Sequence, residues 1–111
     1  MEHATIKNIS AHEAKELIEK KTEITIIDVR TPIEFKMGTI ENSINLDAYS
    51  PSIMNKLNEL NKNNKYLIYC RTGARSSMII NAMKQMGFIK IYHIQNGILE
   101  WERNGFKTVK N

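Results

Sequence analysis

The sequence predicts an α/β fold, with a mostly parallel central sheet of about five strands and helices on both faces. Short apolar, β-branched segments alternate along the chain with segments whose apolar residues recur at helical spacing. Serine and threonine cap signals open several of the helical segments, and polar or glycine-containing turns separate the elements. Strands that alternate with helices are typical of a parallel sheet joined by right-handed crossovers.

Length and composition indicate one domain. The chain has 111 residues, which is too short for two ordinary domains and long enough for one hydrophobic core. Hydrophobic residues make up 41% of the chain, a value typical of a folded domain rather than a disordered one. We therefore predict a single domain over residues 1–111, with its core at about residues 5–107, and find neither repeats nor linkers.

The first predicted elements are an edge strand and a helix. Residues 5–9 alternate in polarity as an edge strand does. Ser10 and Glu13 then form a capping box, which predicts the start of a helix. The residues expected on the buried face of that helix are Ala11, Ala14, Leu17 and Ile18.

A second strand and a second cap follow. Residues 23–29 are almost continuously apolar and β-branched, as expected of a buried parallel strand. Thr31 and Glu34 repeat the cap signature, with a proline at the first helical position, and the short helix should end at Gly38. Residues 43–46 predict a further short strand.

The second half continues the alternation. A helix should begin at Ser50 and Pro51 and bury Ile53, Met54, Leu57 and Leu60. A polar turn at residues 61–65 precedes a buried strand at 66–69 and a helix at 77–86 that ends at Gly87. The last expected elements are a strand at 90–94 and a helix at 97–103.

The only cysteine of the chain, Cys70, lies between a predicted strand and a predicted helix. A cysteine at such a junction faces backbone N–H groups and the positive end of the helix dipole, and both stabilise the nucleophilic thiolate. Arg71 and Arg75 follow, and Gly73 between them allows successive N–H groups to point inward as an anion nest. A purely structural cysteine would gain nothing from these neighbours, so the segment predicts sulfur or anion chemistry.

Three motifs resemble those of the rhodanese family of sulfurtransferases. Residues 70–76, Cys-Arg-Thr-Gly-Ala-Arg-Ser, resemble the family's active-site loop. Residues 27–40 are similar to its Asp-Val-Arg-x-x-x-Glu-Tyr/Phe-x-x-Gly-His-Ile signature, and residues 97–101 resemble its Gly-Gly-x-x-x-Trp segment. The departures are Thr39 for the usual histidine, Asn42-Ser43 for a common Gly-Ala pair, and Asn96 for the first glycine. None of these departures touches the cysteine loop.

The resemblance implies transfer of sulfane sulfur through Cys70. The thiolate would attack the outer sulfur of an anionic donor, thiosulfate or a persulfide, and a thiol or cyanide would then take that sulfur from the enzyme persulfide, with ping-pong kinetics. No general base is expected, because a thiolate needs no deprotonation, and no cofactor is implied. The residues expected to bind the substrate are Arg71, Thr72, Gly73, Ala74, Arg75 and Ser76, with Arg75 also bracing the loop.

Other polar residues are expected to have structural roles. Asp28, Arg30 and Glu34 should form an ion network that supports the site, because carboxylates in direct contact would repel an anionic donor. His93 is expected at the rim or surface of its strand. The three histidines are scattered and the chain has one cysteine, so no metal site is predicted.

Two alternatives have to be weighed. Cysteine phosphatases and arsenate reductases use a similar anion cradle, but they resemble Cys-x5-Arg, whereas Arg75 follows Cys70 after four residues. A phosphatase also needs an acid for its leaving group, and no convincing aspartate is found. The other alternative is a non-catalytic or carrier rhodanese module that hands sulfur between protein partners. Non-catalytic modules commonly lack the cysteine, which this chain retains.

Charge and composition limit the partners and the compartment. The net charge is +4, but the lysines are scattered among acidic residues, so nucleic acid is not an expected ligand. No apolar run approaches the ~18 residues that span a membrane, and no secretory signal is recognised. An exposed reactive thiol favours the reducing cytoplasm. The expected partners are a small anionic sulfur donor and a thiol or cyanide acceptor, with a sulfur-donating or sulfur-accepting protein left open.

Overall fold

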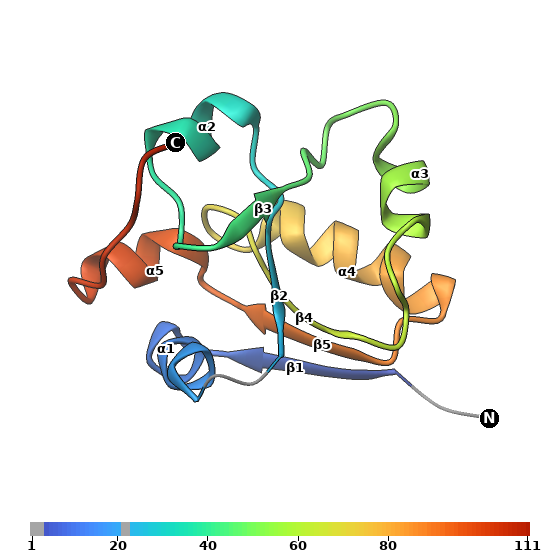
Figure 1. The fold of residues 1–111 in the computed structure, drawn as a ribbon, viewed down its shortest axis with the longest axis horizontal. Helices are drawn as coiled ribbons and strands as arrows, with labels where there is room; N and C mark the ends of the chain where they lie inside the picture. The colour runs from blue at the N-terminus through green and yellow to red at the C-terminus, as the bar shows by residue number, and fades with distance from the viewer. Residues whose placement is uncertain (1–3, 21–22) are drawn as a thin grey trace.

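The computed structural model describes residues 4–20 and 23–111, and it confirms the α/β class (Figure 1). Strands and helices alternate along the chain as β1 Thr5–Ile9, α1 Ala11–Glu19, β2 Thr25–Asp28, α2 Pro32–Met37, β3 Ser43–Asn45, α3 Ile53–Asn58, β4 Lys65–Tyr69, α4 Ala74–Met86, β5 Lys90–Ile94 and α5 Gly97–Arg103. Within the described residues, no helix combines the length and the apolar character that crossing a membrane requires.

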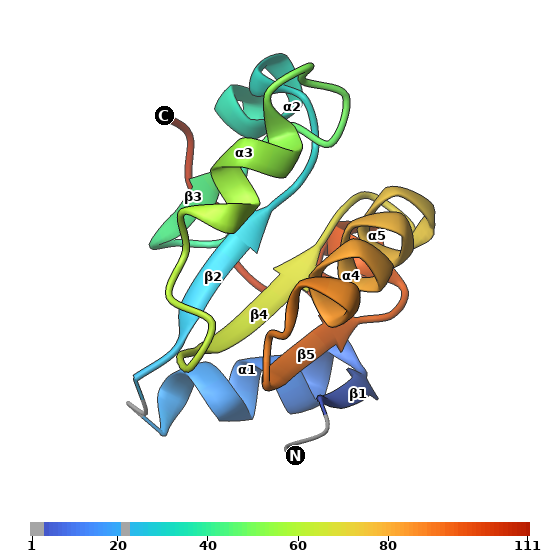
Figure 2. The ribbon, with the colours of Figure 1, turned by 90° about the vertical axis from the view of Figure 1, so that its right-hand side faces the viewer.

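The five strands form one parallel sheet in the order β1-β5-β4-β2-β3 (Figure 2). β1 lies at an edge, as the sequence predicts. Two register pairs position the site: Asp28 of β2 lies opposite Tyr69 of β4, and Asn8 of β1 lies opposite His93 of β5. Because all strands run in one direction, their carboxyl ends share one edge of the sheet, which is where ligands bind in such folds.

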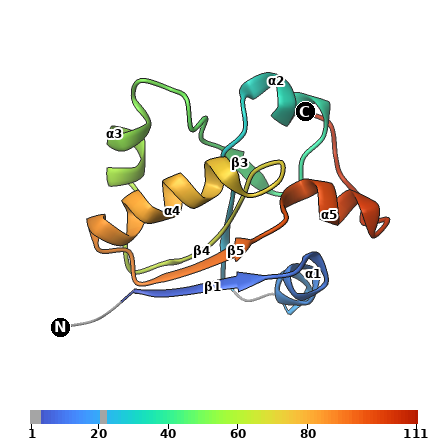
Figure 3. The ribbon, with the colours of Figure 1, turned by 180° about the vertical axis from the view of Figure 1, so that it is seen from behind.

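Helices cover both faces of the sheet, as predicted. Ile27 and Ile68 belong to a core cluster with residues of α3 and α4, whereas the adjacent Ile26 and Leu67 belong to a second cluster with residues of α1 and α5. This division follows from the alternation of side chains along a strand. Figure 3 shows α3 and α4 together along one side of the sheet.

Both predicted capping boxes are present. The Ser10 hydroxyl accepts the Glu13 N–H at 3.1 Å, and the Glu13 carboxylate accepts the Ser10 N–H at 3.0 Å. Thr31 and Glu34 exchange the same pair of hydrogen bonds at the start of α2. Each pair satisfies N–H groups that the first helical turn leaves without an intrahelical partner.

The boundaries of α4 differ from the prediction in a way that matters for the site. The helix begins at Ala74 rather than at residue 77, because Gly73 adopts a left-handed φ of 113° and turns the chain directly into the helix. Arg75 and Ser76 are therefore residues of the first helical turn and not of a loop. The predicted strand 23–29 is also shorter, at Thr25–Asp28.

Candidate active site

Cys70 lies directly after β4 and is almost fully buried, with 1% of its surface exposed. Its Sγ accepts the Gly73 N–H at 3.1 Å and lies 3.2 Å from the Ser76 hydroxyl. Burial raises the pKa of Cys70, but the hydrogen bonds from the Ser76 side chain and from backbone N–H groups outweigh it and bring the pKa below its ordinary value. This geometry supports the prediction of a site that stabilises the thiolate. The prediction that the thiol is exposed is wrong.

The start of α5 holds the Cys70 segment in place. The Ile98 N–H donates to the Cys70 carbonyl at 2.9 Å, and the Leu99 N–H donates to the Arg71 carbonyl at 3.2 Å. Gly97, with φ of 67°, packs so closely that a Cβ at this position would overlap the Arg71 carbonyl. The loop between β4 and α4 accordingly lies beside the amino end of α5 in Figure 1.

Arg75 braces the start of α4 against α2. Its guanidinium donates to both carboxylate oxygens of Glu34, at 2.6 and 3.0 Å, and lies 5.8 Å from the centre of the Tyr49 ring. The Arg75 hydrogen bonds lower the pKa of Glu34 to about 2. Arg75 and Glu34 thus form an ion pair between α4 and α2.

Asp28 and Arg30 form a second, separate ion pair beneath the site. Arg30 donates to the Asp28 carboxylate through its backbone N–H, Nε and Nη2, with the shortest contact at 2.7 Å. Arg30 Nη2 also donates to the Gly38 carbonyl at 2.6 Å. The single network expected of Asp28, Arg30 and Glu34 is therefore divided, because Glu34 turns instead toward Arg75.

Two residues outside the predicted set complete the Asp28 cluster. Thr39 is buried, and its hydroxyl donates to Asp28 Oδ2 at 2.8 Å and lies 2.6 Å from the Tyr69 hydroxyl. Tyr69 in turn accepts the Ile40 N–H at 3.1 Å. Thr39, which stands where the family usually has a histidine, thus still makes polar contacts. The sequence offered one signal for Tyr69, because the hydroxyl of a tyrosine on a buried strand needs a hydrogen-bond partner.

The remaining motif residues face outward. Arg71, Thr72 and Ala74 are exposed, and Arg71 lines a shallow pocket of about 260 Å³ together with residues of α2 and α5. The other lining residues are Arg30, Ile33, Glu34, Met37, Gly38, Ile98 and Glu102. An exposed guanidinium at this edge suits an approaching anion, and substrate binding by the loop residues stays a prediction.

His93 contradicts its predicted surface position. It is buried, with 4% of its surface exposed, and its Nε2 lies 2.6 Å from the Ser76 hydroxyl. Its Nδ1 lies 3.0 Å from Asn8 Oδ1 on the edge strand. Burial lowers the pKa of His93 below its ordinary value. Strand alternation carried a signal for this position, because residues 91 and 93 share a face and Ile91 is an evident core residue.

The fold and the site define a class of protein: an α/β domain that carries a cysteine at the carboxyl edge of its sheet, in surroundings that stabilise the thiolate. Comparison with known proteins gives the family. Residues 10–104 match the family described as Rhodanese-like domain. The chain therefore belongs to the rhodanese-like domain family.

Individual relatives agree with this assignment. The chain is 27% identical to a protein named sulfurtransferase from Allochromatium vinosum, over 94% of this chain and 95% of that protein. It is 33% identical to the putative sulfurtransferase YtwF of Bacillus subtilis, over 87% and 91%. The crystal structure of a rhodanese-related protein from Thermoplasma volcanium superposes with a TM-score of 0.82 at 30% identity, covering 95% of this chain and 99% of that one. Other relatives are longer, and the chain spans 23% to 52% of several of them.

Proposed function

We propose that this chain is a sulfurtransferase that moves sulfane sulfur from thiosulfate or a persulfide to a thiol or to cyanide, carrying it on Cys70. The observation that supports this most directly is the environment of the Cys70 sulfur. It accepts the Gly73 N–H at 3.1 Å beside the amino end of α4, where the helix dipole favours negative charge. The two relatives named as sulfurtransferases support the same activity.

The reaction consists of two displacements at sulfur. The Cys70 thiolate attacks the outer sulfur of thiosulfate, the S–S bond of the donor breaks, and sulfite leaves with the bonding electron pair. The terminal sulfur of the resulting persulfide carries negative charge, which the backbone N–H groups at residues 71–76 can stabilise. An acceptor thiolate or cyanide then attacks this terminal sulfur and releases the Cys70 thiolate. Because the first product leaves before the acceptor binds, the kinetics should be ping-pong.

Burial of Cys70 limits which donors fit. With 1% of the residue exposed, only a slender group reaches Sγ, and the terminal sulfur of thiosulfate or of a persulfide has a single substituent. The positive charge of the exposed Arg71 attracts the anionic remainder of the donor. A free thiolate of this kind is maintained in a reducing compartment, and the cytoplasm remains our prediction.

The ion pair of Arg75 argues against the phosphatase alternative. In a phosphoryl-transfer cradle the arginine has to be available to the phosphate oxygens, whereas Arg75 directs both ends of its guanidinium to Glu34. The helix also begins at Ala74, which leaves only residues 71–73 between Cys70 and the helix. Sulfur transfer is the chemistry that this short segment supports best.

Intact-mass measurement after incubation with thiosulfate, in the absence of reductant, tests the proposal. The wild-type chain should gain one sulfur atom, and cyanide should remove it with release of thiocyanate, whereas Cys70→Ser should gain none. A folded wild-type protein that forms no adduct with thiosulfate or with a small persulfide would contradict the proposal and favour a non-catalytic or carrier module. Equal adducts on wild type and Cys70→Ser would also contradict it.

A further inference from the structure

A chain of hydrogen bonds leads from the reactive sulfur into the protein interior. Cys70 Sγ lies 3.2 Å from Ser76 Oγ, Ser76 Oγ lies 2.6 Å from His93 Nε2, and His93 Nδ1 lies 3.0 Å from Asn8 Oδ1. The three residues that continue this chain beyond Cys70 come from three elements, α4, β5 and β1. Ser76 is fully buried and His93 is 4% exposed, so bulk water does not separate these groups.

The number of protons available along this series of hydrogen bonds determines which group is the donor in each bond. The Asn8 oxygen can only accept, so Nδ1 of His93 carries a proton, and Nε2 of the neutral ring holds a lone pair. Ser76 has one hydroxyl proton, and its shortest contact directs that proton to His93 Nε2. The Ser76 oxygen is then an acceptor toward Cys70, and the thiol S–H can donate to it. The Gly73 carbonyl, at 3.1 Å from Ser76 Oγ, is the more distant acceptor.

We propose that His93 takes up the Cys70 proton through Ser76, which makes His93 a positioning residue for the sulfur-transfer reaction. The thiol proton moves to Ser76 Oγ while the proton of Ser76 moves to His93 Nε2. The electron pair of the S–H bond remains on sulfur. The products are a Cys70 thiolate, a neutral serine and an imidazolium. The inference deepens the proposed function, since it explains how a buried thiol becomes the nucleophile.

The resulting charges are well matched to their neighbours. The thiolate accepts the Gly73 N–H and the new Ser76 proton, while the imidazolium donates from Nδ1 to Asn8 and from Nε2 to Ser76. Every proton of the relay therefore has an acceptor, as buried polar groups require.

The protonation of His93 is coupled to that of Cys70, because the groups that face His93 are uncharged. Among the described residues, the sheet register and the hydrogen bonds place Asn8 from β1, Ile68 from β4 and Ser76 from α4 beside it, and none of these is charged. Lys7 and Tyr92, next in sequence to Asn8 and His93, lie on the other face of the sheet with residues of α1.

Arg75 is the charged residue next to Ser76 on α4, and its ion pair with Glu34 offsets its charge. Burial lowers the pKa of His93, so the imidazolium forms only when the thiolate is there to balance it.

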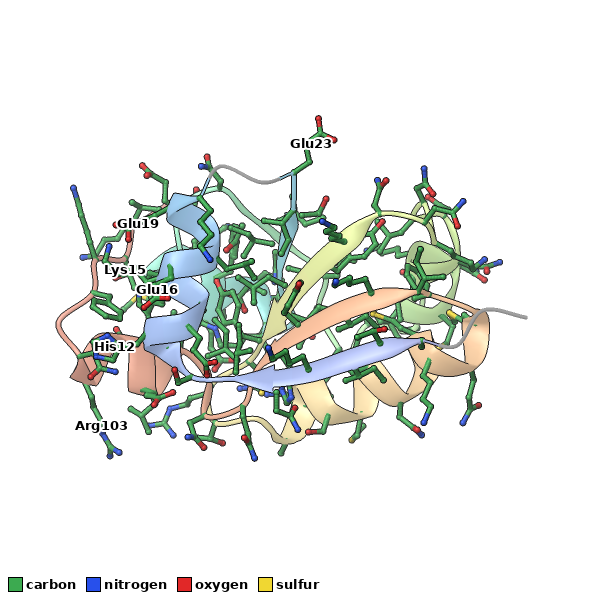
Figure 4. All side chains as sticks on the ribbon, turned by 90° about the horizontal axis from the view of Figure 1, so that it is seen from below. His12, Lys15, Glu16, Glu19, Glu23 and Arg103 are labelled. Atoms are coloured by element: carbon green, nitrogen blue, oxygen red, sulfur yellow. The ribbon has the colours of Figure 1, made fainter. Side chains whose placement is uncertain are left out.

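The rate at which iodoacetamide alkylates Cys70, measured against pH, tests the relay in wild type and His93→Gln. Glutamine keeps a hydrogen-bonding side chain but cannot take the proton. We expect the apparent pKa of Cys70 to rise, with alkylation at pH 7 about tenfold slower and the plateau rate at high pH unchanged. His12→Gln is the control, because His12 is exposed on α1 (Figure 4) and contacts Phe106 outside the relay.

A merely structural His93 would leave the midpoint of that pH profile unchanged, and such a result would overturn the proposal. If His93→Gln does not fold, NMR titration of the His93 ring in wild type and Cys70→Ser decides instead. The relay predicts a higher pKa for His93 in the wild type, and identical titrations would overturn it. Neither measurement uses a sulfur donor, so failure of the relay and failure of the proposed sulfur transfer are distinguishable.

Discussion

At the scale of single residues, Glu34 connects the local structure of α2 to the position of the reactive segment. Its carboxylate accepts the Thr31 N–H at 3.1 Å, which caps α2, and it also accepts both N–H donors of Arg75 on α4. The cap is local and was evident from the sequence. The Arg75 contact joins residues 41 positions apart, and no local pattern specifies it. One side chain therefore fixes both the start of a helix and the distance between two elements of the site.

Glu34→Gln should reduce the acid sensitivity of the fold. The folded pKa of Glu34 is about 2 and its ordinary value is 4.5, so its ion pair stabilises the protein above pH 4.5 and loses that contribution as the pH falls toward 2. Urea unfolding at pH 6 and pH 3 measures this. Wild type should lose more stability between the two pH values than the variant, by about 1 kcal/mol or less, because the pair is partly exposed.

The matched control for this measurement is Glu19→Gln. Glu19 pairs with Lys15 at 3.2 Å on the exposed face of α1, where both side chains are labelled in Figure 4. Its loss should leave the acid sensitivity close to that of wild type. The same acid-induced loss in Glu34→Gln as in wild type would show that the Arg75 pair does not stabilise the folded state.

At the scale of elements, the amino end of α5 and the Cys70 segment determine each other's position. Two backbone hydrogen bonds join them, and the absence of a side chain at Gly97 permits the approach. The motif at residues 97–101 was predicted from resemblance alone, and the packing supplies the physical reason for its glycine. Asn96, which replaces the first glycine of the family's pair, has a φ of −100° and needs no left-handed conformation.

Gly97→Ala should destabilise the protein and displace the Cys70 segment. Gly105→Ala is a matched control, because Gly105 has a similar φ of 74° but no atom of the described residues lies within 4 Å of the added Cβ. The conformational strain common to both should cost about 1–2 kcal/mol. Overlap with the Arg71 carbonyl should add about 2 kcal/mol or more at Gly97, together with loss of sulfur transfer. Urea unfolding compares them, and equal losses in the two variants would refute the packing argument.

At the scale of the whole molecule, a buried polar cluster ties together strands that are distant in sequence. Thr39 bonds to Asp28 of β2 and to Tyr69 of β4. Its backbone N–H donates to the Val109 carbonyl at 2.9 Å and its carbonyl accepts the Val109 N–H, so the C-terminal segment is fixed at the same point. The central sheet, the base of the site and the end of the chain therefore meet at one residue.

Thr39→Val should destabilise the fold by about 1–3 kcal/mol, because an isosteric apolar side chain removes a hydrogen bond from two buried groups. Chemical denaturation provides the measurement. Thr25→Val is the control, since Thr25 is half-buried on β2 and valine suits a strand. Equal stability of Thr39→Val and wild type would mean that the cluster can rearrange without loss.

Much of the fold could be predicted because its signals are local. The caps at Ser10 and Thr31, the apolar run of β4 and the glycine after α4 each lie within a few residues of the feature they specify. The start of α4 was harder to predict from the sequence. Gly73 packs so closely against the Gln95 carbonyl that a Cβ would overlap it, and no local pattern shows a contact between segments this far apart in the sequence.

The sequence by itself determined the order of the elements, the α/β class, the family resemblance and the place of Cys70 between a strand and a helix. These follow from periodicity and chain order, which a linear pattern carries. Only the tertiary structure decided the burial of Cys70, the pairing of Glu34 with Arg75 and the contact of Ser76 with His93. Those depend on which side chains converge across the sheet, and register and packing between distant segments set that convergence.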